Sequence, residues 1–121
     1  MKTVALLTLL SAIHMVESEG GKTSKNELQI TDICIRDVNR IVRDAGGDWQ
    51  YKTSDKYDLV KSRGIALIYL CHYGNVYKRK TGKEPTAEVY ARIYNGGPDG
   101  WKKKSTEAYW KKVSKKQEEI K

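Results

Sequence analysis

The chain of 121 residues has no phenylalanine and only two prolines, two cysteines and two histidines. Its aromatic packing must therefore come from eight tyrosines and three tryptophans, whose polar groups need hydrogen-bond partners when they are buried. Neither Cys34 nor Cys71 lies in a CxxC or Cys/His ligand pattern, which excludes a zinc site. Both cysteines lie in apolar helical surroundings, so we expect buried free thiols rather than a disulfide.

Several familiar catalytic patterns are also missing. There is no Ser/His/Asp arrangement, no Cys/His pair and no phosphate-binding loop, and the isolated His14 and His72 favour structural roles. We expect no metal ion and no cofactor. The apolar run from Val4 to Ile13 is too short for an ordinary transmembrane helix. No repeat, linker or strand-like alternation is evident.

The composition indicates one soluble globular domain over residues 1–121, expected to be a monomer. Hydrophobic residues make up 39% of the chain and charged residues 31%, which is typical of folded proteins. The net charge is +8, and lysines become dense between residues 102 and 116. Such a balance attracts polyanions, which include nucleic acid, anionic membranes and acidic bacterial wall polymers. Charge alone does not choose among them.

The apolar spacing predicts a mainly α fold of about five helices, with room for a minimal β-hairpin near residues 20–30. The segment from Ile65 to Cys71 is apolar almost all round, so it should be the buried central helix. The last helix should fade into the polar tail that follows residue 113. Candidate helix N-caps are Thr31, Asp58, Thr86, and Ser105 or Thr106.

The first twenty residues have two interpretations. Residues 1–18 form either an amphipathic first helix or a secretory signal with an apolar core and small residues before a cleavage point at Ser18. We favour the helix. A signal would make the protein secreted, whereas a helix is compatible with a cytoplasmic protein that is released later, as in phages; the localisation stays open.

The most informative stretch is YARIYNGGPDGWKKKSTEAYWKKV, at residues 90–113. Its Gly-Gly-Pro corner ends one helix before the next begins. The stretch resembles the C-terminal motif of small lysozyme-like proteins from phages and bacteria, and it is similar to invertebrate-type lysozymes. Its YNGGP core also looks like the Tyr-Asn-Ala-Gly-Pro motif of soluble lytic transglycosylases. The segments Val16-Glu17-Ser18 and Leu28-Gln29-Ile30 match further motifs of this family in order.

The resemblance implies a peptidoglycan-cleaving glycosidase acting between N-acetylmuramic acid and N-acetylglucosamine, by lysozyme or lytic transglycosylase chemistry. Glu17 would be the catalytic acid, because glycoside cleavage needs a proton on the leaving oxygen. Gln29 would bond a sugar substituent or orient Glu17. The opposite wall would carry a hydroxyl, an amide, close backbone and an aromatic ring that either stacks on sugar or packs in the core: Tyr94, Asn95, Gly96 and Trp101.

The chain departs from that family in one place. Invertebrate-type lysozymes have an Asp between the catalytic Glu and the Gln motif, and no Asp lies between Glu17 and Gln29 here. Glu19 and Glu27 are unmatched candidates. Lytic transglycosylases need only the Glu, which fits this chain better. The loop is also shorter than in the family, with Asn26-Glu27 in place of a Gly-Pro, so one wall of the expected cleft is reduced.

Two other functions remain open from the sequence. Lysines between 102 and 116, together with Trp101, Tyr109 and Trp110, mix positive charge with aromatic rings, as nucleic-acid-binding proteins do. An inactive protein of lysozyme-like fold that only binds peptidoglycan is the third possibility.

Overall fold

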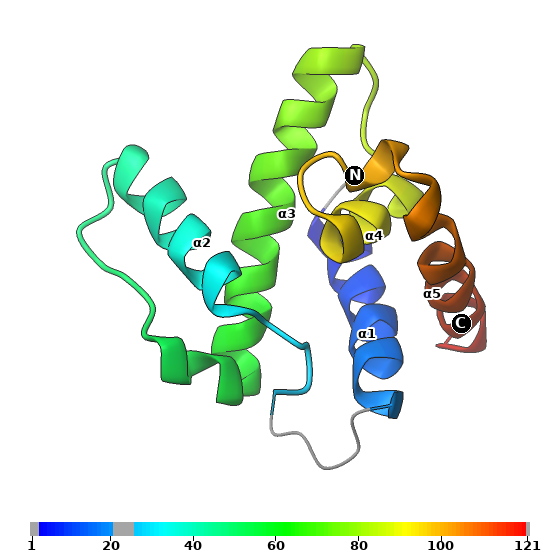
Figure 1. Ribbon diagram of the computed structural model, residues 1–121, viewed down its shortest axis with the longest axis horizontal. Coiled ribbons are helices and arrows are strands. Elements are labelled where there is room, and N and C mark those ends of the chain that lie inside the picture. Colours follow the sequence, from blue (N-terminus) through cyan, green and yellow to red (C-terminus); the bar gives the residue numbers. More distant parts are fainter. Residues whose placement is uncertain (1–2, 21–25, 121) are drawn as a thin grey trace.

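The computed structural model describes residues 3–20 and 26–120, and all of its regular elements are helical (Figure 1). The mainly α prediction is confirmed. Residues 26–31 form a turn and extended chain without strand pairing; the rest of the hairpin predicted near 20–30 falls on residues 21–25, outside the described residues. The α-helices are α1 (Thr3–Gly20), α2 (Asp32–Asp44), α3 (Leu59–Thr81), α4 (Ala87–Gly96) and α5 (Glu107–Ile120), and the 3-10 helices are η1 (Thr53–Tyr57), η2 (Gly100–Lys102) and η3 (Lys104–Thr106).

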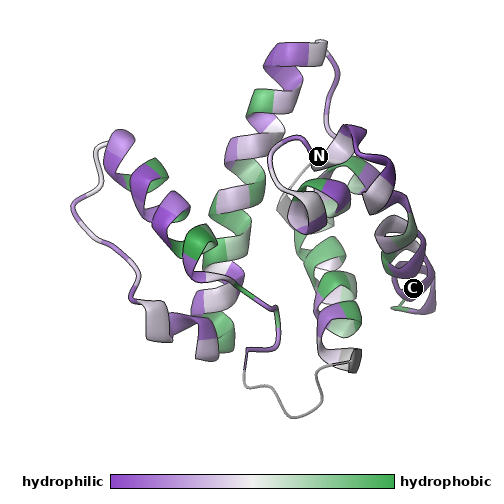
Figure 2. Cartoon of the chain, viewed as in Figure 1, coloured by the Kyte–Doolittle hydropathy of each residue, from purple (hydrophilic) through white to green (hydrophobic). Residues whose placement is uncertain are grey.

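Helix α3 lies at the centre, as predicted, with α2 against one side and α4 against the other (Figure 1). Helices α1 and α5 pack against each other and against α4. Apolar residues gather on the inner sides of α1 and α3, while the outer surfaces of α2 and α5 are largely hydrophilic (Figure 2). Ile65 and Leu70 of α3 are fully buried, and so is Ile93 of α4. One continuous core therefore joins all five helices.

Helix α1 contributes strongly to that core. Leu6, Leu9, Leu10 and Ile13 follow the i, i+3, i+4, i+7 pattern of one helix face and are buried, so they form one apolar stripe. Burying each such side chain contributes about 1.5–3 kcal/mol. Residues 3–18 are thus helical, as favoured from the sequence, while cleavage of this segment as a signal stays an untested alternative. Within the described residues, none of the helices combines the length and apolarity that a bilayer crossing requires.

Three predicted N-caps are confirmed. The side chains of Thr31, Asp58 and Thr86 accept hydrogen bonds from backbone N–H groups three residues later, at 3.0, 3.2 and 3.3 Å. Each satisfies an N–H that the first turn of a helix leaves without an intrahelical partner. These caps fix where α2, α3 and α4 begin.

The predictions for the last helix were wrong at both ends. Neither Ser105 nor Thr106 caps α5, which begins at Glu107 after η3; the Thr106 hydroxyl instead lies against the carbonyls of Gly100 and Lys103, at 2.7 and 2.9 Å. The helix also continues to Ile120 rather than fading after residue 113. Val113 is fully buried, so packing against the core holds α5 in register.

A tight corner joins α4 to α5. Gly97 ends α4 with φ of 90°, a left-handed conformation that glycine adopts without a steric penalty. A side chain on Gly100 would come within 2.0 Å of the Arg92 carbonyl oxygen, so backbone packs directly on backbone there. The Arg92 guanidinium closes the corner by donating to Thr106 Oγ1 and to the Lys103 carbonyl, each at 2.8 Å. This corner fixes the C-terminal end of α4.

Both cysteines are free thiols, as predicted. Their expected burial is correct in part: Cys34 is largely enclosed, whereas Cys71 is exposed on α3. Burial, with a smaller contribution from the charge of Asp37, raises the pKa of the Cys34 thiol to about 12. That thiol therefore stays protonated at neutral pH and is a poor nucleophile.

Candidate active site

Glu17 lies near the end of α1 and is half-buried. Tyr109 of α5 donates a hydrogen bond to its Oε2, with 2.5 Å between the two oxygens, although the residues are 92 positions apart in the chain. The packing of α1 against α5 creates this contact. The carboxylate is therefore held in one orientation by the last helix.

Burial raises the pKa of Glu17 above the ordinary value of 4.5. The hydrogen bond from Tyr109 and the positive charge of Lys112 act in the opposite direction and lower the pKa, but the loss of hydration outweighs both. Burial also raises the pKa of Tyr109, so its hydroxyl stays protonated and donates to the carboxylate. Glu17 thus retains a proton at higher pH than a solvated glutamate does.

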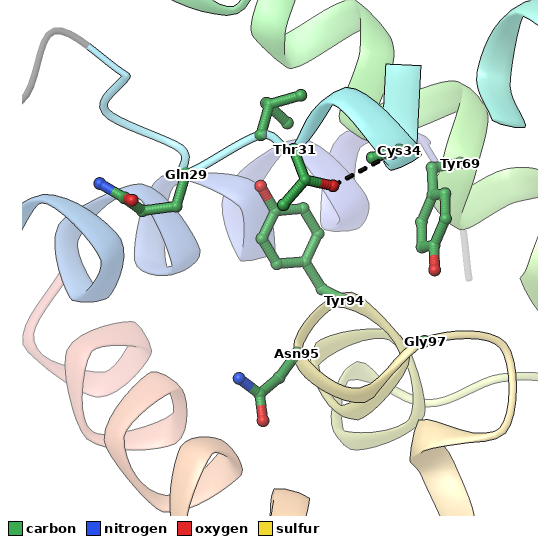
Figure 3. Close-up of a pocket in the computed structure, with 8 residues that line it drawn as sticks. Gln29, Thr31, Cys34, Tyr69, Tyr94, Asn95 and Gly97 are labelled. Carbon is green, nitrogen blue, oxygen red and sulfur yellow. Dashed lines mark hydrogen bonds between the residues drawn. The ribbon is translucent and has the colours of Figure 1, made fainter. Parts of the chain in front are cut away.

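A cavity of about 210 Å³ lies between the start of α2, the middle of α3 and the end of α4 (Figure 3). The cavity includes three of the residues selected from the sequence: Gln29, Tyr94 and Asn95. In Figure 3 the Tyr94 ring points from the end of α4 toward the segment that carries Gln29 and Thr31. The other lining residues are Ile30, Thr31, Cys34, Tyr69 and Gly97.

Gln29 is held in an unusual backbone conformation. Its φ is 54°, the left-handed region that non-glycine residues rarely adopt. Asn26 supports it: the Asn26 carbonyl accepts from both the backbone N–H and the side-chain amide of Gln29, each at 3.0 Å. The Asn26 side chain bonds the backbone N–H and carbonyl of Ile30 at 2.9 and 2.7 Å. Asn26, which replaces the Gly of the resembling family, therefore orders the short loop before α2.

Tyr94 anchors the other side of this loop. Its hydroxyl donates to the carbonyl oxygen of Leu28 at 2.5 Å, across a sequence separation of 66 residues. The proton that we expected Tyr94 to offer to a sugar is thus already used within the fold. Asn95 is exposed, and within the described part of the chain its side-chain amide has no hydrogen-bond partner. The amide of Asn95, rather than the hydroxyl of Tyr94, is available to a ligand.

Gly96 and Trp101 do not line this cavity. A side chain on Gly96 would come within 2.5 Å of the Thr106 methyl group, so this glycine allows the corner to close. The Trp101 ring packs edge-on against Tyr77, with 4.9 Å between ring centroids, and contacts the hydrophobic core. Trp101 thus has the packing contacts of one of the two roles considered, and its stacking on a sugar stays a prediction. Gly97 takes the position on the cavity wall instead.

Glu17 is not itself a lining residue of the cavity, and Tyr94 connects the two. Burial raises the pKa of Tyr94 strongly, and the negative charge of Glu17 adds to the shift. Glu17 is therefore electrostatically coupled to the residue at the centre of the cavity wall. Two amides thus line the cavity, and a carboxyl group of raised pKa outside the lining interacts with it through Tyr94.

The second carboxylate remains without a clear candidate. Glu27 pairs with His14 of α1, with 3.3 Å between the nitrogen and the oxygen, and the side chain of Glu19 is outside the described residues. Among the described residues, no carboxylate shifts the pKa of Glu17. In the part of the chain that the structure describes, no group of three or more His, Cys, Asp or Glu residues is arranged so that it could hold a metal ion.

Two residues with roles at this site were missed from the sequence as site residues. Tyr109 was considered only as an aromatic in a basic surface, and Asn26 only as a departure from the family pattern. The absence of phenylalanine was the available signal for Tyr109, because the chain has to bury tyrosines instead and most buried hydroxyl groups have a hydrogen-bond partner. Nothing in the sequence indicated that the partner would be Glu17.

A mainly helical domain that has a half-buried glutamate of raised pKa, and an amide-lined cavity whose Tyr94 is electrostatically coupled to that glutamate, is compatible with a glycosidase. No family model matches the chain. The chain is similar to Lysozyme 1 from Crassostrea virginica, with 37% identity over 68 residues. The match covers 56% of this chain and 33% of the relative, so the chain corresponds to about a third of the length of that lysozyme. At this coarse level the comparison supports a lysozyme-like relationship.

Proposed function

We propose that this chain is a glycosidase of peptidoglycan, which cleaves the β-1,4 bond between N-acetylmuramic acid and N-acetylglucosamine with Glu17 as general acid. The observation that carries the proposal is the environment of Glu17. Its side chain is half-buried, its carboxylate accepts a hydrogen bond from Tyr109, and its pKa is raised. A carboxyl group in that environment keeps its proton to a higher pH than a solvated one and can donate it to a leaving oxygen. The similarity to Lysozyme 1 supports the same class of reaction.

Gln29 and Asn95 are the residues proposed to bind the N-acetyl sugar. Both side chains belong to the cavity, and an amide offers a donor and an acceptor to the acetamido group. Asn26 and Tyr94 act indirectly, because they fix the backbone on either side of Gln29. Binding then requires little rearrangement of the loop, which reduces its entropic cost.

In the proposed reaction, Glu17 gives its proton to the glycosidic oxygen as the bond between that oxygen and the anomeric carbon breaks. The centre that forms has oxocarbenium character. A hydroxyl group of the same sugar then attacks the anomeric carbon and loses its proton to the Glu17 carboxylate, which regenerates the acid. This anhydro-sugar route needs one carboxylate, in keeping with a Glu17 pKa that no described carboxylate shifts. Attack by water instead would give hydrolysis.

Turbidity clearing of purified peptidoglycan tests the proposal. We expect the parent protein to clear the suspension and Glu17→Gln, which keeps the shape of the side chain, to lose nearly all of that activity. Equal clearing by both would refute the role of Glu17. Product mass separates the two chemistries, since the anhydro product is lighter than the hydrolysis product by one water. Peptidoglycan binding without clearing by the parent would indicate a binding protein.

Nucleic-acid binding is the other outcome to measure. Lys111, Lys112 and Lys115 of α5 are exposed, and an acidic polymer of either kind would be attracted to them. Tight DNA binding that weakens steeply with salt, without clearing of peptidoglycan, would favour that function over the one proposed.

A further inference from the structure

A second cavity lies at the far end of α2 from the candidate active site. It has a volume of about 390 Å³ and is lined by Asn39, Arg43, Gly47, Asp48, Trp49 and Gln50. The first cavity is lined at Thr31 and Cys34, where α2 starts. Arg43 lies nine positions after Cys34, which is about 14 Å along a helix. The two cavities are therefore separate sites.

Trp49 is the most unusual residue of this second cavity. Its side chain is 51% exposed although tryptophan is the largest apolar residue. Its ring stands at 85° to that of Tyr51, with 5.3 Å between centroids. Within the described residues, the indole N–H has no hydrogen-bond acceptor. Trp49 thus presents both a ring surface and an unused donor to solvent.

The backbone around Trp49 is rigidly held although it has no regular structure. Asn39 bonds the backbone of Tyr51 in both directions, at 2.8 and 3.0 Å. The Tyr51 hydroxyl lies so close to Gly64 of α3 that a side chain there would come within 2.7 Å of it. Tyr51 is therefore anchored to both α2 and α3, and it braces Trp49 from the edge. The position of the Trp49 ring is therefore already fixed in the protein without a ligand.

The polar rim of the cavity is unused within the fold. In the described part of the chain, the side chains of Arg43, Asp48 and Gln50 make no hydrogen bond or ion pair. The rim therefore offers a cationic donor, an anionic acceptor and an amide around one aromatic ring. A sugar has hydroxyl groups that both donate and accept, together with a C–H face that packs on an aromatic ring, and it matches such a mixed rim. A phosphodiester matches it poorly, because the carboxylate of Asp48 repels it.

We propose that this cavity is a second glycan-binding site, in which Trp49 stacks on a sugar ring and Arg43, Asp48 and Gln50 bond its hydroxyl or acetamido groups. The choice of an amino-sugar glycan as the ligand rests on the proposed function. The site itself takes no part in cleavage. It holds a neighbouring part of the polymer, or another strand, and so raises the effective concentration of substrate at Glu17.

Titration of the tryptophan indole signals by NMR tests this proposal. The probe is a linear β-1,4-linked tetramer of N-acetylglucosamine, added to ¹⁵N-labelled Glu17→Gln protein so that no cleavage occurs. The Trp49 signal is the one absent from a Trp49→Phe sample. We expect the Trp49 signal to shift and to saturate as the tetramer is added. In Trp49→Ala, binding at the site is followed through the backbone amides of residues 47–51, and we expect it to be weaker by about tenfold or more.

Two variants keep the test decisive. Tyr57→Ala removes another exposed aromatic side chain, 56% exposed and outside the cavity, and should leave the affinity unchanged. The double variant Asp48→Ala, Gln50→Ala retains Trp49 and should weaken binding about fivefold, which guards against misfolding of Trp49→Ala.

A Trp49 signal that stays unchanged at saturation of the other cavity would overturn the proposal. So would a larger shift with single-stranded DNA than with the tetramer at equal concentration. Binding at this site is measured without catalysis. If the parent protein does not clear peptidoglycan, the proposed function is refuted, whereas the second glycan-binding site is not.

Discussion

Tyr94→Phe is the most informative single substitution, because it removes one oxygen atom and leaves the ring in place. The lost hydroxyl donates to the carbonyl of Leu28, a residue that is fully buried. A buried carbonyl left without its donor costs about 1–3 kcal/mol. We therefore expect the free energy of unfolding to fall by that amount, measured by urea denaturation with an unchanged slope.

Backbone strain at Gln29 reduces the loss of unfolding free energy that is expected for Tyr94→Phe. An L-residue in the left-handed conformation costs about 1–2 kcal/mol, and loss of the tether allows Gln29 to relax from its φ of 54°. Relaxation would recover part of the lost stability. In a Gln29→Gly background there is no strain to release, so Tyr94→Phe should cost at least as much there as in the parent. Tyr94→Phe should weaken glycan binding at the cavity in the parent protein. It should not weaken it in the Gln29→Gly protein, because the amide that Tyr94 helps to position is already absent there.

Tyr77→Phe is the matched control. Tyr77 is also buried, and within the described residues its hydroxyl makes no hydrogen bond. Its loss should change stability by less than about 0.5 kcal/mol. If Tyr94→Phe were as harmless as Tyr77→Phe, the role assigned to the Tyr94 hydroxyl would be refuted.

Two predictions concern Glu17. Tyr109→Phe removes a hydrogen bond that lowers the pKa of Glu17, so this pKa should rise further, as followed by ¹³C NMR of the carboxyl group; a pKa that stays constant or falls would contradict the contact. Because folding raises the pKa of Glu17 above 4.5, its contribution to stability is fully present below that pH and is lost as the pH rises through the folded-state value. Glu17→Gln should therefore be more stable than the parent near neutral pH and should lose that advantage in acid, which urea midpoints across pH would check; an advantage that grows in acid would show the opposite sign.

The helices were predictable because their signals are local. Thr31, Asp58 and Thr86 bond N–H groups only three residues away, so each cap could be identified without knowing the fold. The start of α5 was missed because the Thr106 hydroxyl makes other hydrogen bonds instead of capping the helix. It bonds the backbone of the corner and the Arg92 side chain, and this pairing exists only once α4 and α5 have met.

The candidate site was predictable only in part. Motif resemblance indicated Gln29 and Asn95, which do share a cavity with Tyr94. The direction of the Tyr94 hydroxyl depends on a contact 66 residues away, and that of Tyr109 on one 92 residues away. No local pattern encodes such distances. Trp101 was undecided for the same reason, since its packing partner Tyr77 comes from another helix.

The pairing of α1 with α5 has a consequence for the synthesis of the protein. Glu17 leaves the ribosome about ninety residues before Tyr109, which is its hydrogen-bond partner. Until α5 has emerged and docked, the Glu17 carboxylate lacks the hydrogen bond from Tyr109 and the nearby charge of Lys112, which both lower its pKa. In the nascent chain the Glu17 carboxylate is therefore without the contact that fixes its orientation, and it gains that contact only when the last helix is in place. Premature termination before Tyr109 would leave a product that has every motif of the first four helices and a Glu17 carboxylate without its hydrogen-bond donor.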